Sequence, residues 1–566
     1  MKKRIMSLLL CAAMLLTLCA CAATEPRGSV NPGRDTDSAP ELPQGTITPA
    51  AGDKTYFQDV WRGDAKYSAK DYERYEREWL DEYLDPIYDL AANGGTAEEF
   101  SDADFELTEE LCYIHTMLTY IMLQNSADPD NESVAGDLLH MQELYYTAMD
   151  EYWNAMHAMA VSPNAGLMEG TYHPDLISDF REYEPVEDDS ELEAYSAENA
   201  LINEYYRLMA QDETDYDAVG QVFIDLVELR RGSVDGSGWY DSYADYVYES
   251  YYGRDYTPGD ARAVWQGAKE YIVPVMLSYA DGVYDGVDLL MSSNAVDYSS
   301  AAIINNMDKI LPRVSGELYT AFRYMVDYRL FDISHDPRKA NTGYTTIFYY
   351  LNEPYIFNAA YDEFYDYTDM FHEFGHFVNY FYTMSDLFFG LSDNDLSELQ
   401  SQGMELMFTH YYDEIFGEYS DAALGYLLLN MIYSIVDGAF YDEFQQRVYA
   451  EENLTVERVN EIYAGLYQEY GYEPYDGYET EWMGVSHNFD NPFYYISYAV
   501  SAVGALELYK LMDDDWEQGL DKFLTVLAMD TEIYYYSGAL AEAGLRDVFD
   551  TDTYGAIAGQ LEESLG

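Results

Sequence analysis

The segment His372-Glu-Phe-Gly-His376 constrains this chain more than any other, because it gathers two imidazoles and a carboxylate within five residues. Residues four apart in an α-helix lie one above the other on the same face, so His372 and His376 can bind one metal ion. The carboxylate of Glu373 would then lie beside the open coordination position, where it can accept a proton from water. The pattern predicts a helix that carries a Zn²⁺ site.

An apolar stripe supports this helix. Phe371, Phe374, Val378 and Phe381 recur at helical spacing on the side away from the histidines. The chain has nine histidines in 566 residues. A chance His-Glu-x-x-His match is therefore expected on the order of once in a hundred such chains. Two surface histidines on an acidic helix are the weaker interpretation.

A third protein ligand is expected, since a catalytic zinc site has three protein ligands and one open position. Asp395, Glu398, Gln402 and Glu405 share one face of a second predicted helix. Glu398 is the predicted ligand. Glu405 and Asp369 are candidates to orient a ligating imidazole through its other ring nitrogen. The alternative is an acidic face that is simply solvated.

A third segment, His487 to Tyr498, offers hydrogen-bond donors. Asn491 and Pro492 predict the N-cap and the first residue of a helix, which would place Tyr494 and Tyr498 on one face. His or Tyr donors can stabilise the oxyanion that forms when a peptide carbonyl is attacked. Tyrosine makes up 61 of the 566 residues, so tyrosine pairs at this spacing are also expected by chance.

These three segments resemble the thimet oligopeptidase and oligoendopeptidase F family of zinc metallopeptidases, which is of the gluzincin type. The similarity rests on Phe371–His376, on the Glu-x-x-Ser motif Glu398–Ser401 with the further Glu405, and on His487 with its Phe-Tyr-rich sequel. Gln400 departs from the thimet-like branch, and Ile496-Ser497 departs from oligoendopeptidase F. The subfamily and the exact oxyanion donor therefore stay open.

The resemblance implies a mainly α-helical, zincin-like fold, with two lobes around a deep channel and a small β-sheet near the zinc helix. It implies one Zn²⁺ per chain and hydrolysis of internal bonds in short, unfolded peptides. It also implies that a strand before the zinc helix pairs with the substrate backbone. The residues concerned are catalytic Glu373, His487, Tyr494 and Tyr498, metal-binding His372, His376 and Glu398, and substrate-binding Tyr355, Ile356, Phe357 and Asn358.

Three alternatives remain. The nearest is a carboxypeptidase or dipeptidase on the same scaffold. The second is a non-catalytic, lipid-anchored peptide-binding protein with an idle zinc site, which the presence of Glu373 disfavours because a binding protein needs no general base. The third is a structural surface protein, disfavoured because the sequence has no internal repeat.

The first 20 residues have the parts of a bacterial secretion signal. Lys2, Lys3 and Arg4 precede an apolar run that ends in Leu18-Cys-Ala-Cys21, which resembles a lipobox. Cleavage before Cys21 and lipidation of this cysteine would anchor the chain in the lipid bilayer, facing outside the cytoplasm. A signal peptide that ends in Cys by chance is the alternative. Residues 21–53 then form a flexible linker, rich in Pro, Gly, Ser and Thr.

The body of the chain, residues 54–566, is long enough for a large core, and its pattern is helical almost throughout. Ser68–Ala92, Glu187–Ala210 and Leu424–Ala450 are amphipathic stretches that predict helices. Asp212–Gly238 and Ser292–Ser299 are candidate hinges. The body predicts no transmembrane helix.

A formal net charge of −76 limits the partners of the chain. Such a charge repels phosphate backbones, so nucleic-acid binding is not expected. It can concentrate cationic peptides, or it can simply keep an exported protein in solution. The sequence gives no indication of the oligomeric state.

Overall fold

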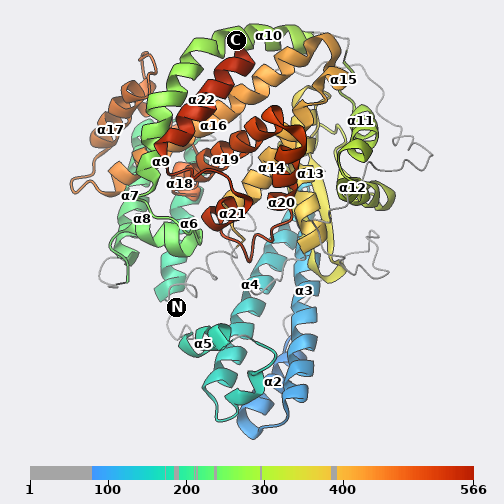
Figure 1. Cartoon of the computed structure of the whole chain (residues 1–566). Helices are drawn as coiled ribbons and strands as arrows, with labels where there is room; N and C mark the ends of the chain where they lie inside the picture. Colours follow the sequence, from blue (N-terminus) through green and yellow to red (C-terminus); the bar gives the residue numbers. More distant parts are fainter. Residues whose placement is uncertain are drawn as a thin grey trace. The chain divides into compact units, whose positions relative to one another are not determined.

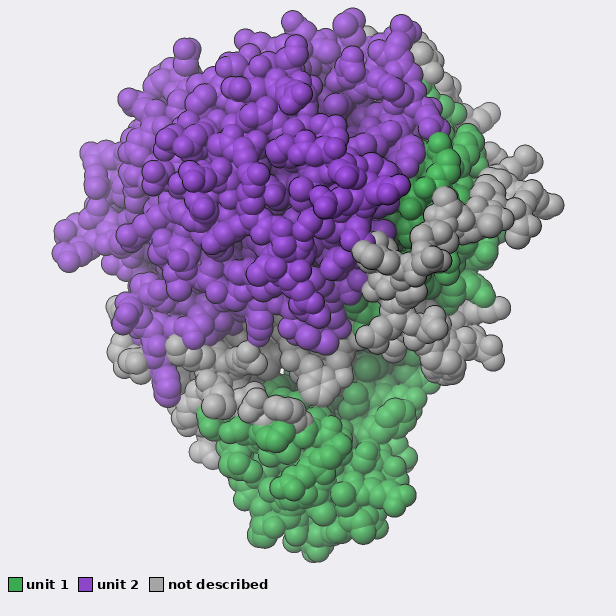
Figure 2. Space-filling model, in the orientation of Figure 1, with its two compact units in different colours: residues 1–185, 295–390 green, residues 186–294, 391–566 purple. Residues whose placement is uncertain are grey.

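The computed structural model describes residues 79–172, 174–183, 190–209, 211, 214–234, 239–292, 296–383 and 392–566. The predicted signal segment, Cys21 and the linker lie outside these residues. Most of the described chain is helical, as Figure 1 shows. The chain divides into two compact units: unit 1 comprises Met1–Pro185 and Ala295–Gly390, and unit 2 comprises Val186–Asn294 and Leu391–Gly566 (Figure 2).

Unit 1 combines long helices with a small sheet. Its elements are α2 (Asp81–Asn93), α3 (Ala97–Ala127), α4 (Glu132–Val161), η2 (Ala165–Met168), α5 (Pro174–Glu182), α11 (Ser300–Val314), α12 (Gly316–Tyr328), β1 (Phe331–Asp332), β2 (Gly343–Phe348), η5 (Tyr349–Leu351), β3 (Glu353–Asn358) and α13 (Tyr365–Thr383). A capping box starts α3, since Thr96 and Glu99 exchange side chain to backbone hydrogen bonds. The buried faces of α2 to α5 share one hydrophobic core, which includes Phe100, Trp153 and Phe180.

The sheet of unit 1 has the strand order β1-β3-β2. β3 pairs in parallel with β1 and antiparallel with β2, where Thr345 lies opposite Ile356. Tyr344 and Phe348 pack against Leu123 of α3 on one face of the sheet. Side chains alternate along a strand, so Thr345 faces the other way, toward α13, which packs on β2 and β3. A mainly α fold with a small sheet beside the His-Glu-x-x-His helix is thereby confirmed.

Unit 2 is built from helices of very different lengths. Its elements are α6 (Ser190–Met209), α7 (Tyr216–Val234), α8 (Tyr243–Tyr246), the π-helix η3 (Val247–Tyr251), α9 (Ala261–Gly267), the π-helix η4 (Ala268–Ile272), α10 (Val273–Ser292), α14 (Asn394–Thr409), α15 (Tyr412–Phe416), η6 (Gly417–Tyr419), α16 (Ser420–Tyr449), α17 (Val456–Glu469), η7 (Tyr478–Gly484), α18 (His487–Asp490), α19 (Tyr495–Asp514), α20 (Trp516–Leu527), α21 (Tyr536–Ala543) and α22 (Thr551–Leu565).

The helix α19 is the centre of unit 2. It packs against α14, α16, α20 and α22. Ala499, Val500, Ala502 and Ala505 point in different directions around the helix, and all four are fully buried. A helix that is apolar on every side must be covered on every side, so α19 sets where its neighbours lie.

One stretch of the described residues, Tyr412–Tyr449, is long and apolar enough to cross a membrane by length and composition alone. Inside the structure, 67% of its apolar window is buried by the rest of the chain. Its long helix, α16, packs against α10 and α19. These contacts are those of a core helix.

The predicted helices are present with small shifts at their ends. The predicted Glu187–Ala210 corresponds to α6, and the predicted Leu424–Ala450 corresponds to α16. α2 covers the described part of the predicted Ser68–Ala92 from Asp81 onward. The connection between α10 and α11 falls within Ser292–Ser299, where the chain passes from unit 2 to unit 1.

The predicted hinge at Asp212–Gly238 is wrong. Most of this segment is the helix α7, in which Val219 and Phe223 are fully buried. Gly220 does not mark a turn of the chain. A Cβ atom at this position would lie 2.8 Å from the side chain of Val456, so the glycine lets two helices approach closely.

A close contact between α16 and α19 yields a stability prediction. A Cβ atom at Gly438 would lie 2.6 Å from the backbone oxygen of Tyr495 and 2.7 Å from the Cβ of Ala499. Gly438→Ala is therefore expected to destabilise the protein by about 1–3 kcal/mol, because backbone must move to admit the methyl group. Thermal and urea unfolding measure the effect.

Gly465→Ala is the matched control, since a Cβ atom there meets nothing within 4 Å in the interior of α17. It should raise stability by about 0.5–1 kcal/mol through helix propensity. A Gly438→Ala protein as stable as the Gly465→Ala protein would contradict the account of α16 and α19.

Candidate active site

The helix α13 carries the His-Glu-x-x-His segment. It starts where the Asp366 carboxylate accepts hydrogen bonds from the backbone N–H groups of Tyr361 and Glu363, at 3.0–3.1 Å. The predicted apolar stripe is buried: Phe371, Phe374 and Val378 at 0% exposure and Phe381 at 7%. On this face Phe374 contacts Phe322 of α12 edge to face, at 6.1 Å between ring centres. Burial of the stripe fixes the rotation of α13.

The two histidines of α13 come together on the other side of the helix. The Nε2 atoms of His372 and His376 are 3.2 Å apart. Two nitrogens that bind one tetrahedral zinc at about 2.0–2.1 Å lie about 3.3 Å apart, so this spacing fits a shared metal ion. Burial, and then the neighbouring His372, holds the pKa of His376 well below its usual value. The imidazole is therefore neutral, which is the form that binds metals.

Glu373 lies between the histidines in sequence and is buried, with 4% exposure. Its carboxylate accepts a hydrogen bond from the Thr345 hydroxyl at 2.7 Å. The same hydroxyl lies 3.0 Å from the backbone oxygen of Glu373. The β2–β3 register sets this contact, because it turns Thr345 toward α13. Sequence reasoning missed Thr345, although its place in a strand just before the metal helix was a usable signal.

The acidic face of the second predicted helix is not solvated. Asp395, Glu398, Gln402 and Glu405 on α14 are only 2–8% exposed. The interpretation as a solvated face is wrong, since α14 is covered on this side as well as on the side that packs against α19 and α20. A buried carboxylate needs a cation or several hydrogen-bond donors. Glu398 therefore has the burial expected of a metal ligand.

Asp369 and Glu405 were predicted to orient a ligand histidine. Asp369 is half-buried on α13, three residues before His372. Glu405 is buried on α14, seven residues after Glu398. Their orienting role stays a prediction.

His487, Tyr494 and Tyr498 form an aromatic cluster in unit 2. The ring of His487 is 5.5 Å from that of Tyr494 and 6.3 Å from that of Tyr498, and the two tyrosine rings are 5.2 Å apart. Burial lowers the pKa of His487 below its usual value, while the nearby Asp490 opposes this shift. Sequence reasoning missed Tyr495, whose ring lies 5.2 Å from that of His487.

The predicted start of the helix after His487 is wrong. Asn491 ends the short helix α18, and α19 begins only at Tyr495. Phe493 adopts the left-handed conformation, with φ of 63°, and its N–H donates to the Gln445 side chain. This turn delays the helix beyond Pro492. Tyr494 and Tyr498 still meet, because Tyr494 occupies the N-cap position.

The strand predicted to bind substrate, β3, is the central strand of the sheet. Ile356 and Phe357 pair with β1 on one side and with β2 on the other. The backbone oxygen of Asn358 accepts a hydrogen bond from Lys339 Nζ at 3.0 Å. Substrate pairing by Tyr355–Asn358 stays a prediction, while both sides of Ile356 and Phe357 are already paired within the sheet.

Sequence comparison shows where the candidate residues belong. Residues 316–529 match the model of peptidase family M3. This segment is a family M3 peptidase domain. The match spans α13, α14 and the His487–Tyr498 segment, so the family expected from the sequence is confirmed. None of the curated proteins matches the chain in sequence.

Solved structures of similar fold cover most of this chain. PZ peptidase A in complex with an inhibitor is 19% identical, with 88% of this chain and 100% of that chain covered and a TM-score of 0.70. A Bacillus anthracis protein assigned as oligoendopeptidase F is 18% identical, with 88% and 98% covered and a TM-score of 0.67. A Pyrococcus furiosus carboxypeptidase is 12% identical, with 87% and 100% covered and a TM-score of 0.53. At these identities the likeness shows the fold alone.

The family M3 domain supports a metallopeptidase. Within it, the α13 residues provide two imidazole nitrogen donors and an adjacent buried carboxylate. This donor set fits a zinc ion, which is bound by neutral imidazole and carboxylate groups. The hydrogen bond from the Thr345 hydroxyl holds in place the Glu373 carboxylate, which is adjacent to this donor set in sequence.

Thr345→Val tests this hydrogen bond. The variant is expected to lower kcat for peptide cleavage by about 10- to 100-fold, because a hydrogen bond to a charged group contributes about 1.5–3 kcal/mol. The zinc content should not change. Steady-state kinetics on a quenched peptide measures the effect.

Thr346→Val is the matched control, since the next residue of β2 points to the other face of the sheet. Its kcat should stay close to that of the wild type. A Thr345→Val enzyme with wild-type kcat would remove Thr345 from the account of the site.

Proposed function

We propose that this chain is a zinc-dependent oligopeptidase that hydrolyses internal bonds of short, unfolded peptides. The observation that carries the proposal is the pair of imidazole nitrogens 3.2 Å apart on α13, within a family M3 peptidase domain. Figure 1 labels α13 and α14, the helices whose side chains provide the proposed ligands.

The proposed ligands are His372 and His376 of α13 and Glu398 of α14. Each side chain offers one ligand atom, an imidazole nitrogen or a carboxylate oxygen. Two histidines and one glutamate are a known ligand set of catalytic zinc sites, with the fourth position left for water or substrate. The burial of Glu398 supports its assignment, as does the family resemblance of its motif. Zinc at this site would act as a Lewis acid that lowers the pKa of water and polarises the scissile carbonyl.

Glu373 is the proposed general base. Its carboxylate accepts the proton of the attacking water and later donates this proton to the nitrogen of the leaving amine. The Thr345 hydroxyl keeps the carboxylate in place during both transfers. The proton thus passes from the water to the amine through one residue.

His487, with Tyr494 or Tyr498, is proposed to donate hydrogen bonds to the oxyanion of the attacked carbonyl. Such donors act most strongly when the charge develops, which is why they favour the transition state over the bound substrate. The three rings contact one another, and this packing limits their rotation. Contact within the cluster supports a shared role for these residues.

Glu373→Gln tests the proposed chemistry. The variant should retain zinc and lose about 100- to 10,000-fold in kcat, because the ligands remain while the general base is removed. Chelation of zinc in the wild type should abolish cleavage, and added Zn²⁺ should restore it. Zinc analysis and cleavage of a quenched peptide provide both readouts.

Glu363→Gln serves as the control, since Glu363 is an acid that precedes α13 and has no proposed role in proton transfer. Activity of Glu373→Gln within a factor of about three of this control would exclude Glu373 as the base. If the chain is a peptide-binding protein with an idle site, then neither the wild type nor either variant should show zinc-dependent cleavage.

A carboxypeptidase is the second candidate, since the Pyrococcus furiosus carboxypeptidase shares the fold. Internal cleavage is favoured because the fold is more similar to that of the Bacillus anthracis protein assigned as oligoendopeptidase F, with a TM-score of 0.67, than to that of the carboxypeptidase, with 0.53. A peptide blocked at both ends separates the two activities. An endopeptidase would cut this peptide into two fragments, each with one blocked end. A carboxypeptidase would leave it intact and would shorten the same peptide only when its C-terminus is free.

We further propose that the enzyme acts outside the cytoplasm, anchored by a lipid on Cys21. The support is the lipobox-like sequence Leu18–Cys21 behind a basic and apolar signal. Cys21→Ala should move the protein from the membrane fraction to the soluble fraction or leave an uncleaved precursor. Detergent partitioning that is unchanged by Cys21→Ala would contradict lipid anchoring.

A further inference from the structure

Arg254 of unit 2 is a charged residue in an unusual place. It follows the π-helix η3, and its side chain is only 2% exposed. A buried guanidinium is costly unless charges and hydrogen-bond acceptors surround it. The partners of Arg254 therefore show what the chain gains from burying it.

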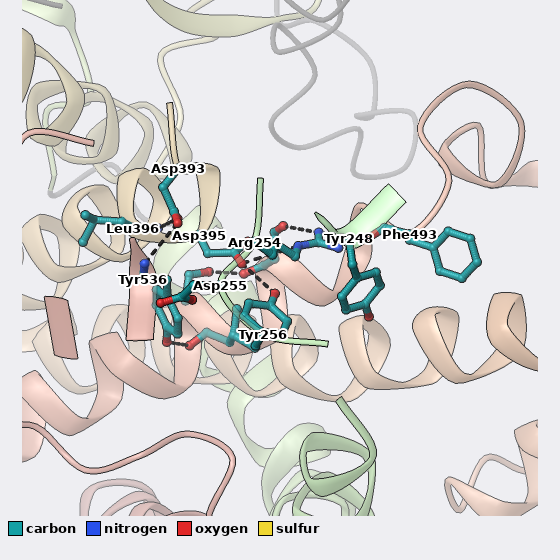
Figure 3. A network of polar contacts seen from close by, with 12 residues as sticks. Tyr248, Arg254, Asp255, Tyr256, Asp393, Asp395, Leu396, Phe493 and Tyr536 are labelled. Atoms are coloured by element: carbon teal, nitrogen blue, oxygen red, sulfur yellow. Dashed lines mark hydrogen bonds and ion pairs between the residues drawn. The ribbon is translucent and has the colours of Figure 1, made fainter. Parts of the chain in front are cut away.

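Three kinds of partner surround the Arg254 guanidinium, and Figure 3 labels Asp395, Phe493 and Tyr248 among them. Nη2 donates to the backbone oxygen of Phe493 at 3.0 Å and to Oγ of Ser497 at 2.8 Å. Nε lies 3.5 Å from a carboxylate oxygen of Asp395. The rings of Tyr248 and Tyr252 lie 4.5 and 4.4 Å from the guanidinium carbon, within the range of cation–π attraction.

The hydrogen-bond and ion-pair partners belong to two segments that the proposed chemistry uses. Asp395 is one turn before Glu398 on α14, on the same face of that helix. Phe493 and Ser497 directly precede Tyr494 and Tyr498, respectively. One planar group thus connects the helix of the proposed ligand with the segment of the proposed oxyanion donors.

Both connected segments are held in constrained arrangements. Phe493 is in the left-handed region, where its N–H donates to Gln445 and its oxygen accepts from Arg254. At the other segment Asp393 caps α14 by accepting from Leu396 N at 2.8 Å, and it also accepts from Tyr536 N at 3.0 Å. These contacts fix both chain segments on either side of the guanidinium.

Asp393 and Asp395 make the cation necessary. Burial, and then the charge of Asp395, holds the pKa of Asp393 well above its usual value. Asp395 also accepts a hydrogen bond from the Tyr256 hydroxyl at 2.6 Å (Figure 3). Without Arg254, the buried Asp395 carboxylate would lie near Asp393 and lose the positive charge of the guanidinium. We expect the start of α14 to rearrange in that case.

We propose that Arg254 is a positioning residue of the active site, which holds Glu398 and the Tyr494–Tyr498 segment at a set spacing through Asp395, Phe493 and Ser497. The inference rests on the proposed function, because it concerns the zinc ligand and the oxyanion donors. Arginine suits this position, since its planar group lies beside the Asp395 carboxylate through Nε while Nη2 donates to two further oxygens, whereas a lysine ammonium is a single point charge on a flexible stem.

Arg254→Lys tests the proposal because it keeps the charge and removes the fork. It is expected to weaken zinc binding about 10- to 100-fold, as loss of groups behind metal ligands does, and to lower kcat about 10- to 100-fold. KM should stay within about threefold of the wild type, since no contact with bound substrate is removed. Chelator competition on the metal-free protein measures the zinc affinity, and steady-state kinetics separates kcat from KM.

Asp395→Asn is the second variant, in case Arg254→Lys does not fold. It keeps the size of the side chain and an acceptor for Tyr256, and it should weaken zinc binding in the same way. The double variant should lose little more than the larger single effect, because both substitutions break the same link.

Arg230→Lys is the matched control. Arg230 is also a buried arginine of unit 2, paired with Glu198 at 2.7 Å, and its contacts are with Glu198, Tyr449 and Phe489 rather than with α14. It should lower stability and leave zinc affinity unchanged.

The outcomes separate two failures. A wild type that binds zinc and cleaves peptide, with Arg254→Lys and Asp395→Asn equal to it in zinc affinity and kcat, would overturn the role of Arg254 alone. Equal losses of zinc affinity in Arg254→Lys and Arg230→Lys would reduce Arg254 to a general structural residue. A wild type that neither binds zinc nor cleaves peptide would overturn the proposed function and this inference with it.

Discussion

The approach of two imidazoles on one face of α13 is the interaction on which the proposed chemistry depends. Their nitrogens lie 3.2 Å apart because the two residues are one helical turn apart, and burial of Phe371, Phe374 and Val378 turns both histidines away from the core. Rotation of α13 by even a few tens of degrees would bury a histidine or expose a phenylalanine. The apolar packing of unit 1 therefore sets the direction in which the two histidines face.

In unit 2, acidic side chains and hydrogen-bond donors are buried, and their positions depend on neighbouring charges and on helix packing. α14 carries Asp395, Glu398 and Glu405 at 2–8% exposure, a costly arrangement without compensating charge. Arg254 provides such a charge next to Asp395. The covered helix α19 provides the rigid support, since it packs on α14 and begins at the turn that holds Tyr494. The positions of the polar side chains in this unit therefore depend on the packing of the apolar helix α19.

Local patterns predicted the helical fold and the helices of the candidate site, and non-local contacts account for what was missed. The stripe from Phe371 to Phe381 predicted α13, since burial follows the helical period. Thr345 was missed because only the β2–β3 register turns it toward Glu373. Asn491 and Pro492 predicted a helix start that the structure does not have. Gln445 and Arg254, which are distant in sequence, hold Phe493 in a left-handed turn instead.

The measurement that tests the central claim most directly is zinc K-edge X-ray absorption on the zinc-loaded protein. The account predicts one zinc per chain with four nitrogen or oxygen ligands at about 2.0–2.1 Å, and outer-shell scattering from two imidazoles. A protein that binds no stoichiometric zinc, or a spectrum with one imidazole or with three, would contradict a site made by His372, His376 and Glu398.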